Sequence, residues 1–280
     1  SPASSYAKKW AVSPSGNFVI LGNKYYDPTG LGSAHGQVRV FKYDSGTSSW
    51  SEIFNAAGIP LVGADGDFLG ASVDINDYGY FVVGATGADG DVQNSGSGNA
   101  EVFVYDSSTG QYAKHGTTIS GSQNLAANHN IGWKVSLTNT SVLADLHVSV
   151  MKKPTGIFMP PETVSVYSLN GATWTQVGAE FTSISDFTLC QDSTTNDVYF
   201  VNKSTDLKVY KKNASSWSQL GSTFTLQDNV LNANLLKHFE KVCLSSYNGV
   251  LTMAYQTTTT DENNVYHTNN FVDVKRYDTN

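Results

Sequence analysis

Two Asp-Gly-Asp segments are suited by residue type and spacing to bind a cation. Asp65-Gly66-Asp67 and Asp89-Gly90-Asp91 together offer four carboxylates, and Ca²⁺ binds oxygen ligands of this kind. Asp-Gly is also ordinary turn chemistry, because Asp accepts hydrogen bonds from its own turn and glycine tolerates positive φ. Asp65, Asp67, Asp89 and Asp91 are therefore candidate calcium ligands, with turn formation as the favoured alternative.

Three further carboxylates, Asp74, Asp186 and Glu240, fall on or beside segments typical of the innermost strands of a repeat. Two of them facing one channel could serve as acid and base, or acid and nucleophile, in glycoside hydrolysis. No acidic position recurs between repeats, and the histidines lack the nearby Ser or Cys motif of a nucleophilic triad. The chain is therefore expected not to be an enzyme, with a sugar-cleaving propeller as the alternative.

Aromatic residues in the connecting segments offer a different chemistry, that of sugar binding. An exposed ring can contact the apolar face of a sugar while polar neighbours fix its hydroxyl groups. The evenly spaced Trp50, Trp174 and Trp217 are expected to pack between sheets instead. The candidate ligand-binding residues are Tyr25, Tyr26, His35, Phe158, Tyr266 and His267, with Trp133 nearby.

The elements that position these residues follow from a repeated tyrosine. Each copy closes a short apolar segment, and an aromatic follows seven positions after each of the first four copies. The copies lie 43 to 67 residues apart, which is typical of one supersecondary unit repeated around an axis or along a stack. The tyrosines are Tyr43, Tyr105, Tyr167, Tyr210 and Tyr277, followed by Trp50, Tyr112, Trp174 and Trp217.

Each repeat is predicted to be four antiparallel strands, with hairpin residues such as Asn76-Asp-Tyr-Gly79 between the first two. In the third repeat the second strand is expected at Val142–Ala144. Five such sheets in an all-β chain predict a five-bladed β-propeller, with an open β-solenoid as the alternative. The expected blades are 7–56, 68–119, 131–182, 185–226 and 238–280, within a single domain 1–280.

The connections of such a propeller would differ between its two faces. One face carries only tight hairpin turns, whereas the other carries long segments. Because binding residues concentrate on loops, function is expected on the long-loop face. The long segments are 22–36, 84–99, 149–162 and 256–270.

Composition narrows the classes of partner. The 280 residues carry 24 acidic and 17 basic side chains, for a net charge of −7. This charge argues against general capture of nucleic acid or of an anionic membrane. No apolar run approaches the roughly 20 residues of a membrane helix, so no membrane insertion is expected. Sequons at Asn139, Asn202 and Asn213 favour a secreted or cell-surface glycoprotein.

The second repeat resembles the FG-GAP type of propeller repeat. It reads Phe68-Leu-Gly70-Ala-Ser-Val73, then Gly79-Tyr-Phe-Val-Val-Gly84-Ala85, a glycine-rich loop and Ala100-Glu-Val-Phe-Val-Tyr105. In the third repeat Gly132 precedes Val135 with the same spacing, but the fourth and fifth repeats lack both glycine elements. The resemblance implies an extracellular adhesion or scaffold module, and a protein partner could bind it through the long-loop face.

Members of that family often hold calcium in the turn between the first and second strands. Asp74, Asn76 and Asp77 occupy this turn, so the resemblance makes them candidate ligands. Tyr78 and Val82 stand where two further carboxylates are expected, which leaves few oxygens for a hard cation. No resident cofactor is therefore expected, with Ca²⁺ as the alternative.

The two cysteines, Cys190 and Cys243, align at one position of the innermost strands of neighbouring repeats. A disulfide could join these strands if the Cα atoms lie within about 7 Å of each other. The alternative is a pair of buried thiols that pack as small apolar residues.

The fifth repeat lacks its fourth strand, because the aromatic expected after Tyr277 would lie beyond Asn280. Val272, Val274 and Tyr277 would then lie on an edge strand that another chain could pair with, in self-assembly or in binding a protein partner. The alternative is a domain cut from a longer polypeptide. The sequence thus favours a non-enzymatic extracellular module for adhesion or assembly, with a lectin-like carbohydrate binder as the alternative.

Overall fold

The computed structural model describes residues 9–30, 34–88, 96–120, 129–154, 161–225, 236–260 and 266–278. Within these ranges the chain is all-β, as predicted, and its one helical element is a 3-10 turn, η1 (Leu143–Asp145). Contacts divide the chain into two compact units, Ser1–Val177 and Gly178–Asn280.

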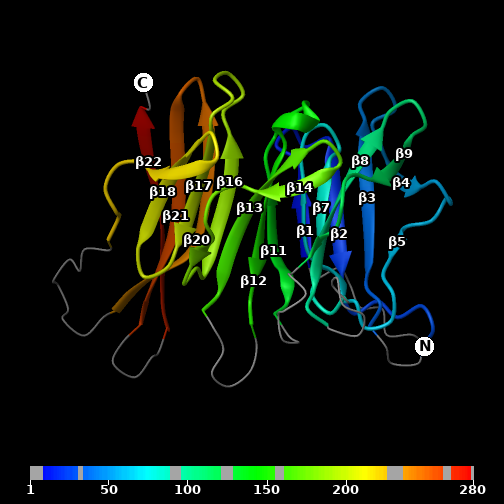
Figure 1. Ribbon diagram of the computed structural model, residues 1–280, viewed down its shortest axis with the longest axis horizontal. Coiled ribbons are helices and arrows are strands. Elements are labelled where there is room, and N and C mark those ends of the chain that lie inside the picture. The colour runs from blue at the N-terminus through cyan, green and yellow to red at the C-terminus, as the bar shows by residue number, and fades with distance from the viewer. Residues whose placement is uncertain are drawn as a thin grey trace. The chain divides into compact units, whose positions relative to one another are not determined.

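The first unit contains three meanders, each made of four antiparallel strands that pair in chain order (Figure 1). Parallel pairing of Phe54 with Gln111 joins the fourth strands of the first two meanders, which therefore share one sheet. The strands are β1 (Lys9–Val12), β2 (Phe18–Asn23), β3 (Gln37–Asp44) and β4 (Ser49–Asn55); β6 (Leu69–Ile75), β7 (Phe81–Ala85), β8 (Asn99–Asp106) and β9 (Gln111–Lys114); and β11 (Ile131–Leu137), β12 (His147–Lys152), β13 (Thr163–Asn170) and β14 (Thr173–Gln176).

Two short strands that the repeat pattern does not predict add to the sheets of the first unit. β5 (Leu61–Val62) pairs with β3, and β10 (Ile119–Ser120) pairs with β8. Each pairs with the third strand of its own meander before the chain enters the next one. The linker is thereby fixed along the sheet edge.

The second unit contains a four-stranded sheet and a three-stranded sheet, both in chain order. Among the described residues the last sheet has no fourth strand, as predicted. Its strands are longer than predicted, so much of the expected loop 256–270 is strand. The strands are β16 (Asp186–Gln191), β17 (Val198–Lys203), β18 (Leu207–Asn213) and β19 (Ser216–Gln219), then β20 (Leu236–Tyr247), β21 (Val250–Thr260) and β22 (Tyr266–Asp278). The two-residue strand β15 (Phe181–Thr182) precedes them and belongs to neither of these two sheets.

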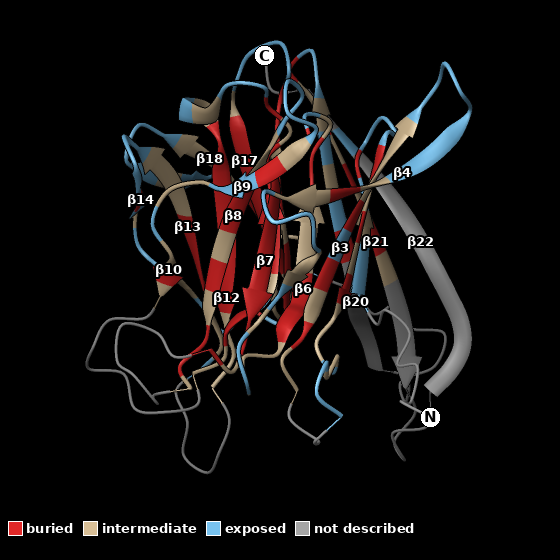
Figure 2. Ribbon diagram, turned by 90° about the vertical axis from the view of Figure 1, so that its right-hand side faces the viewer, coloured by how far each residue is buried: buried red, intermediate tan, exposed pale blue. Residues whose placement is uncertain are grey.

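The core lies where neighbouring meanders pack face to face, and the second strand of each meander contributes buried residues to it. β2 alternates buried and partly buried residues, whereas all five residues of β7 are buried. Strands covered on both faces favour continuous apolar sequence, and Phe81-Val-Val fits that pattern. Figure 2 shows β7 and β12 mostly buried and the tip of β4 exposed.

Two details of the repeat prediction were wrong. The second strand of the third meander is β12 rather than Val142–Ala144, because the connection after Thr138 forms η1 and the apolar alternation begins only at His147. Of the three regularly spaced tryptophans, Trp174 is buried but Trp50 is 48% exposed. Trp50 lies on an outer strand, where its ring packs on Tyr43 with centroids 5.3 Å apart.

Candidate functional site

The predicted ligand-binding residues fall in three groups. Tyr25 is exposed, while Tyr26 and His35 are partly buried. Phe158 lies outside the described residues, and Tyr266 and His267 lie in β22 but their side chains lie outside the described part. Of the described candidates, Tyr25 lines the hollow considered below.

Tyr25 borders a pocket of about 350 Å³, here called the Tyr25–Trp133 pocket. Three successive meanders contribute to it: β1 and the segment after β2 from the first, β6 from the second and β11 from the third. Tyr25 is 45% exposed and Trp133 is 39% exposed, so both rings are accessible. The lining residues are Lys9, Lys24, Tyr25, Gly70, Ala71 and Trp133.

A break in strand pairing places Trp133 at this pocket. The register of β11 against β12 shifts between Ile131 and Val135, and Gly132 has φ of 82°. Irregularities of this kind redirect a side chain, and glycine supplies the positive φ without steric cost. β6 has the same shift around Gly70, also at φ 82°, with Ala71 where β11 has Trp133. The small Ala71 leaves room beside the tryptophan.

Local contacts hold the Tyr25 side of the pocket. The Tyr25 N–H donates to Asn23 Oδ1 (3.2 Å), and its ring meets Phe68 edge to face with centroids 6.4 Å apart. Lys24 Nζ lies 4.9 Å from the Tyr25 ring centroid and 5.8 Å from that of Trp133. One ammonium group therefore lies near both rings, in the range of cation–π attraction.

The sequence predicted Tyr25 but not its partnership with Trp133 and Lys24. The sequence places Trp133 only near the long segments, and no local pattern connects residues 25 and 133. The signal that could have found the pair is the repeated glycine: Gly70 and Gly132 occupy the same place in β6 and β11. The register shift changes the direction of the side chain that follows this glycine, which is Trp133 in β11.

The residues proposed for calcium by family resemblance form hydrogen bonds between neighbouring meanders. Asn76 is buried and its Nδ2 donates to the carbonyls of Thr138 and Thr140. Asp77 accepts from the Ser15 N–H (2.6 Å) and from Asn139 Nδ2 (2.8 Å). Burial would raise the pKa of Asp77, but the hydrogen bonds from Ser15 and Asn139 hold it below the ordinary value. Asn76 and Asp77 therefore link the first hairpin turn of the second meander to the corresponding turns of the first and third meanders.

Only one of the two Asp-Gly-Asp segments lies within the described residues. Asp67 Oδ2 accepts the Ala64 N–H (2.7 Å), the turn chemistry given as the alternative, and Asp65 is exposed. Asp89 and Asp91 lie outside the described residues. Within the described part of the chain, no three His, Cys, Asp or Glu side chains gather as a metal site. The absence of a resident cofactor stays a prediction, with Ca²⁺ as its alternative.

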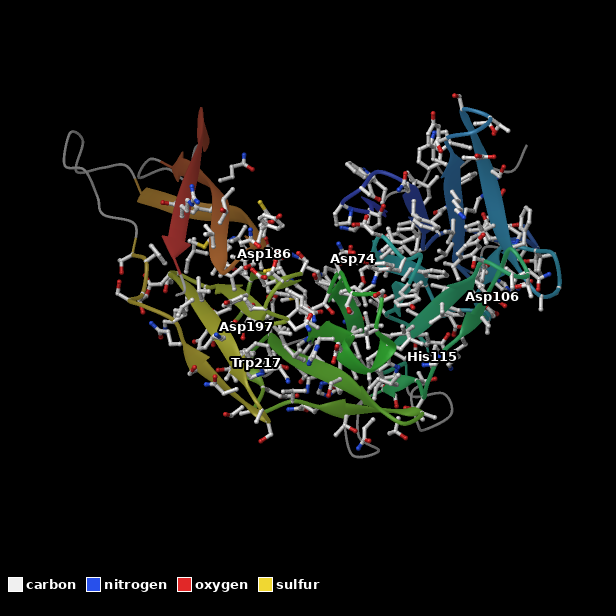
Figure 3. All side chains as sticks on the ribbon, turned by 90° about the horizontal axis from the view of Figure 1, so that it is seen from above. Asp74, Asp106, His115, Asp186, Asp197 and Trp217 are labelled. Atoms are coloured by element: carbon white, nitrogen blue, oxygen red, sulfur yellow. The ribbon has the colours of Figure 1, made fainter. Side chains whose placement is uncertain are left out.

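The carboxylates considered for glycoside hydrolysis contact backbone in the next sheet. Asp74 Oδ2 accepts the Leu137 N–H (2.8 Å), and Asp186 Oδ2 accepts the Val242 N–H (3.4 Å). Asp74 belongs to the first unit and Asp186 to the second, as labelled in Figure 3. The side chain of Glu240 lies outside the described part. Asp74 and Asp186 therefore tie strands of adjacent sheets together.

Replacing Asp74 is expected to stabilise the protein at neutral pH. Burial raises the pKa of Asp74 to about 6, although the Leu137 and Ile75 N–H groups donate to it. The folded state then holds a proton that the unfolded state has lost, so stability falls as pH rises from about 4 to about 6. The shift corresponds to at most about 3 kcal/mol. Asp74→Asn should therefore gain about 1 to 3 kcal/mol at pH 7.5 and little at pH 4.

Urea unfolding at both pH values checks this expectation. Asp106→Asn is the matched control, because hydrogen bonds from Ser108 lower the pKa of Asp106. Its carboxylate contributes stability above its unfolded pKa that is lost as pH falls, the opposite slope. If the free energies of unfolding of Asp74→Asn and of the parent protein fall equally from pH 4 to pH 7.5, ionisation of Asp74 does not cause the loss of stability.

The two cysteines are free thiols, so the disulfide considered from their alignment is not formed. Cys190 is partly buried and packs against the apolar core of the second unit, whereas Cys243 is exposed. The two side chains thus enter different environments although their strands are neighbours. Burial raises the pKa of the Cys190 thiol, and the negative charge of the nearby Asp192 raises it further, by a smaller amount.

The three sequons differ in accessibility. Asn213 is exposed in the turn between β18 and β19, where a glycan has room. Asn202 is buried in β17, the second strand of its sheet, so the folded structure has no room for a glycan there. The Asn139 amide nitrogen, to which a glycan would be joined, donates to Asp77 instead. The Asn213 amide nitrogen likewise donates to Ser218 Oγ (2.6 Å), so its exposure is what distinguishes Asn213 from the other two sites.

The predicted edge residues Val272, Val274 and Tyr277 lie on β22. This strand pairs with β21, and among the described strands it has no second partner. Assembly through this edge stays a prediction. Among the described residues, no helix has the length and apolar character needed to cross a membrane.

Comparison with known proteins gives a limited result. No protein-family model matches the chain, and no curated protein is a significant match. Similar solved structures include a lectin of Aleuria aurantia in complex with Fucα1-6GlcNAc (12% identity, TM-score 0.48, covering 96% of this chain and 78% of that one). AofleA from Arthrobotrys oligospora (10%, 0.49, 96% and 71%) and a Dos1 propeller (11%, 0.49, 92% and 69%) are also similar. At these scores and identities the likenesses carry no inference about a ligand of this chain.

Proposed function

We propose that the chain is a non-enzymatic, extracellular carbohydrate-binding module, and that the Tyr25–Trp133 pocket holds the sugar. We also propose that its five successive meanders are the blades of a propeller whose last blade has three strands. The run of antiparallel meanders in chain order supports the propeller. Adhesion would then follow from sugar binding, so the adhesive role expected from the sequence becomes a consequence of this site.

The pairing of two exposed aromatic rings carries the proposal. Tyr25 and Trp133 come from different meanders and line one hollow that also contains lysine side chains. A sugar has apolar C–H faces and polar edges, so it fits flat rings flanked by hydrogen-bond donors. The rings are placed by backbone features, the Asn23 contact and the Gly132 shift, and are therefore preorganised.

The hollows on the hairpin side support sugar binding less well. Two of them share Lys42, Tyr43, Ser45 and Tyr105. Their rings are already paired, Tyr43 with Trp50 and Phe18 with Tyr105 at 5.8 Å. Phe18 is also buried. Tyr78, which is 46% exposed, also lines one of these hollows, so aromatic surface is present there too. The Tyr25–Trp133 pocket differs because residues of three meanders line it, whereas two meanders line each of these hollows.

Removing either ring of the pocket is expected to weaken glycan binding. Labelled protein would first be screened on a glycan array, and the best ligand titrated by calorimetry. Trp133→Ala and Tyr25→Ala should each weaken binding by about fivefold, because a ring contact contributes on the order of 1 kcal/mol. Trp50→Ala is the matched control, since Trp50 is an exposed tryptophan outside the pocket. A silent array, or unchanged affinity in Trp133→Ala, would refute the proposal.

A further inference from the structure

The Tyr25–Trp133 pocket is basic, although the chain is acidic. The whole sequence has 24 acidic and 17 basic side chains. Two lysines, Lys9 and Lys24, line the pocket, and its described lining contains no Asp or Glu. Lys153 follows β12, the strand that pairs with β11, and its Nζ lies 5.1 Å from the Trp133 ring centroid. Three ammonium groups therefore gather around one aromatic hollow.

The lysines differ in whether a carboxylate already neutralises them. Lys153 forms an ion pair with Glu162 (2.6 Å). Within the described part of the chain, neither Lys9 nor Lys24 has an ion-pair partner. A lysine ammonium offers three hydrogen-bond donors and no acceptor. Lys9 and Lys24 thus leave positive charge at the pocket.

Of the three lysines, Lys24 has the position best suited to determine ligand selectivity. Its ammonium lies near both aromatic rings, 4.9 Å from the centroid of Tyr25 and 5.8 Å from that of Trp133. The ammonium lies over part of both rings, so an anionic group on a sugar that contacts the exposed part of the rings would be within its reach. The donor and the apolar surface are therefore close enough to act on one sugar residue.

We propose that the pocket selects saccharides that carry an anionic group, a carboxylate or a sulfate, over neutral saccharides. This inference rests on the proposed function. The rings contact the C–H face of the sugar, while Lys24, with Lys9, binds the anion. Carboxylates and sulfates share this chemistry, because each presents charged oxygens that accept hydrogen bonds from ammonium groups.

Matched saccharide pairs provide the test. Calorimetry would compare methyl glucuronide with methyl glucoside, and galactose 6-sulfate with galactose, so that each pair differs in the anionic group. The anionic member should bind about tenfold more tightly at about 50 mM NaCl, and the advantage should shrink at about 300 mM as salt screens the charges. Whichever pair shows the larger ratio identifies the preferred anion.

Three variants separate charge from shape. Lys24→Met should abolish the preference, and Lys24→Arg should retain it, since arginine keeps the charge. Lys42→Met is the matched control: Lys42 Nζ also lies over a tyrosine ring, 4.8 Å from the Tyr105 centroid, but outside this pocket. Equal affinity within each pair would overturn the inference and leave the proposed function standing. Failure of every saccharide, charged or neutral, would overturn both.

Discussion

Asp192→Ala is expected to lower the free energy of unfolding by about 3 kcal/mol. Asp192 is fully buried at the turn after β16, and its two oxygens accept four hydrogen bonds. Oδ1 binds the N–H groups of Thr194 and Thr195, and Oδ2 binds the Ser246 hydroxyl (2.7 Å) and the Gly249 N–H (2.9 Å). One carboxylate thus closes its own turn and fastens the β20–β21 hairpin.

The pKa of Asp192 supports this magnitude. Burial alone would raise it, but the hydrogen bonds from Ser246, Thr195, Gly249 and Thr194 lower it to about 2. A folded-state pKa below the unfolded value means stability that is present above about pH 4 and lost as pH falls toward 2. Asp192→Ala should therefore destabilise strongly at neutral pH and less in acid.

Calorimetric melting at neutral pH measures the effect, with Asp197→Ala as the matched control. Asp197 is only partly buried and forms a surface ion pair with Lys211 (2.8 Å). Exposed ion pairs contribute less than about 1 kcal/mol. If the two variants melt together, the carboxylate of Asp192 does not hold the two turns.

The strand pattern was predictable because it is local. Tyr43 pairs across the strands with Trp50, and Tyr105 with Tyr112, so the seven-residue spacing marks a real hairpin. In the third meander the turn is tighter and Leu169 takes the place opposite Trp174. The spacing therefore located the hairpins but not the register of each one.

The candidate site was predictable only on one side. Tyr25 follows a strand in a long segment, which sequence alone shows. Its meeting with Trp133 depends on how three meanders stack and on the shift at Gly132, both long-range features. The same holds for Asp192, whose partners Ser246 and Gly249 lie in the first hairpin of the next sheet. The local sequence does not show whether an acidic residue in a turn is buried and bonds to a second hairpin, or is exposed to solvent.

Close packing of glycines between meanders should make Gly84→Ala one of the most damaging substitutions in the chain. A Cβ at Gly84 of β7 would collide with the carbonyl oxygen of Gly132 on β11, and would lie 2.5 Å from Ser72 Oγ. Ser72 Oγ donates to that same carbonyl (2.7 Å), so neither neighbour can move without losing a buried hydrogen bond. The same approach recurs one meander earlier, where a Cβ at Gly22 would lie 2.5 Å from the Gly70 carbonyl oxygen.

Gly84→Ala is therefore expected to cost about 3 kcal/mol or more, because backbone, unlike a flexible side chain, cannot rotate away from the added methyl group. Gly22→Ala should act in the same direction, since it meets the equivalent carbonyl. Gly46→Ala is the matched control: its Cβ would meet only Asp44 Oδ1, at 3.3 Å, in an exposed turn. Urea unfolding of the three variants measures the loss of stability.

A Gly84→Ala protein as stable as Gly46→Ala would mean that β7 and β11 can move apart without cost. The shared glycine spacing of the second and third repeats would then have no role in packing. A large loss confined to Gly84 and Gly22 would instead explain why glycine recurs at Gly70 and Gly132, the positions that also create the shift beside Trp133.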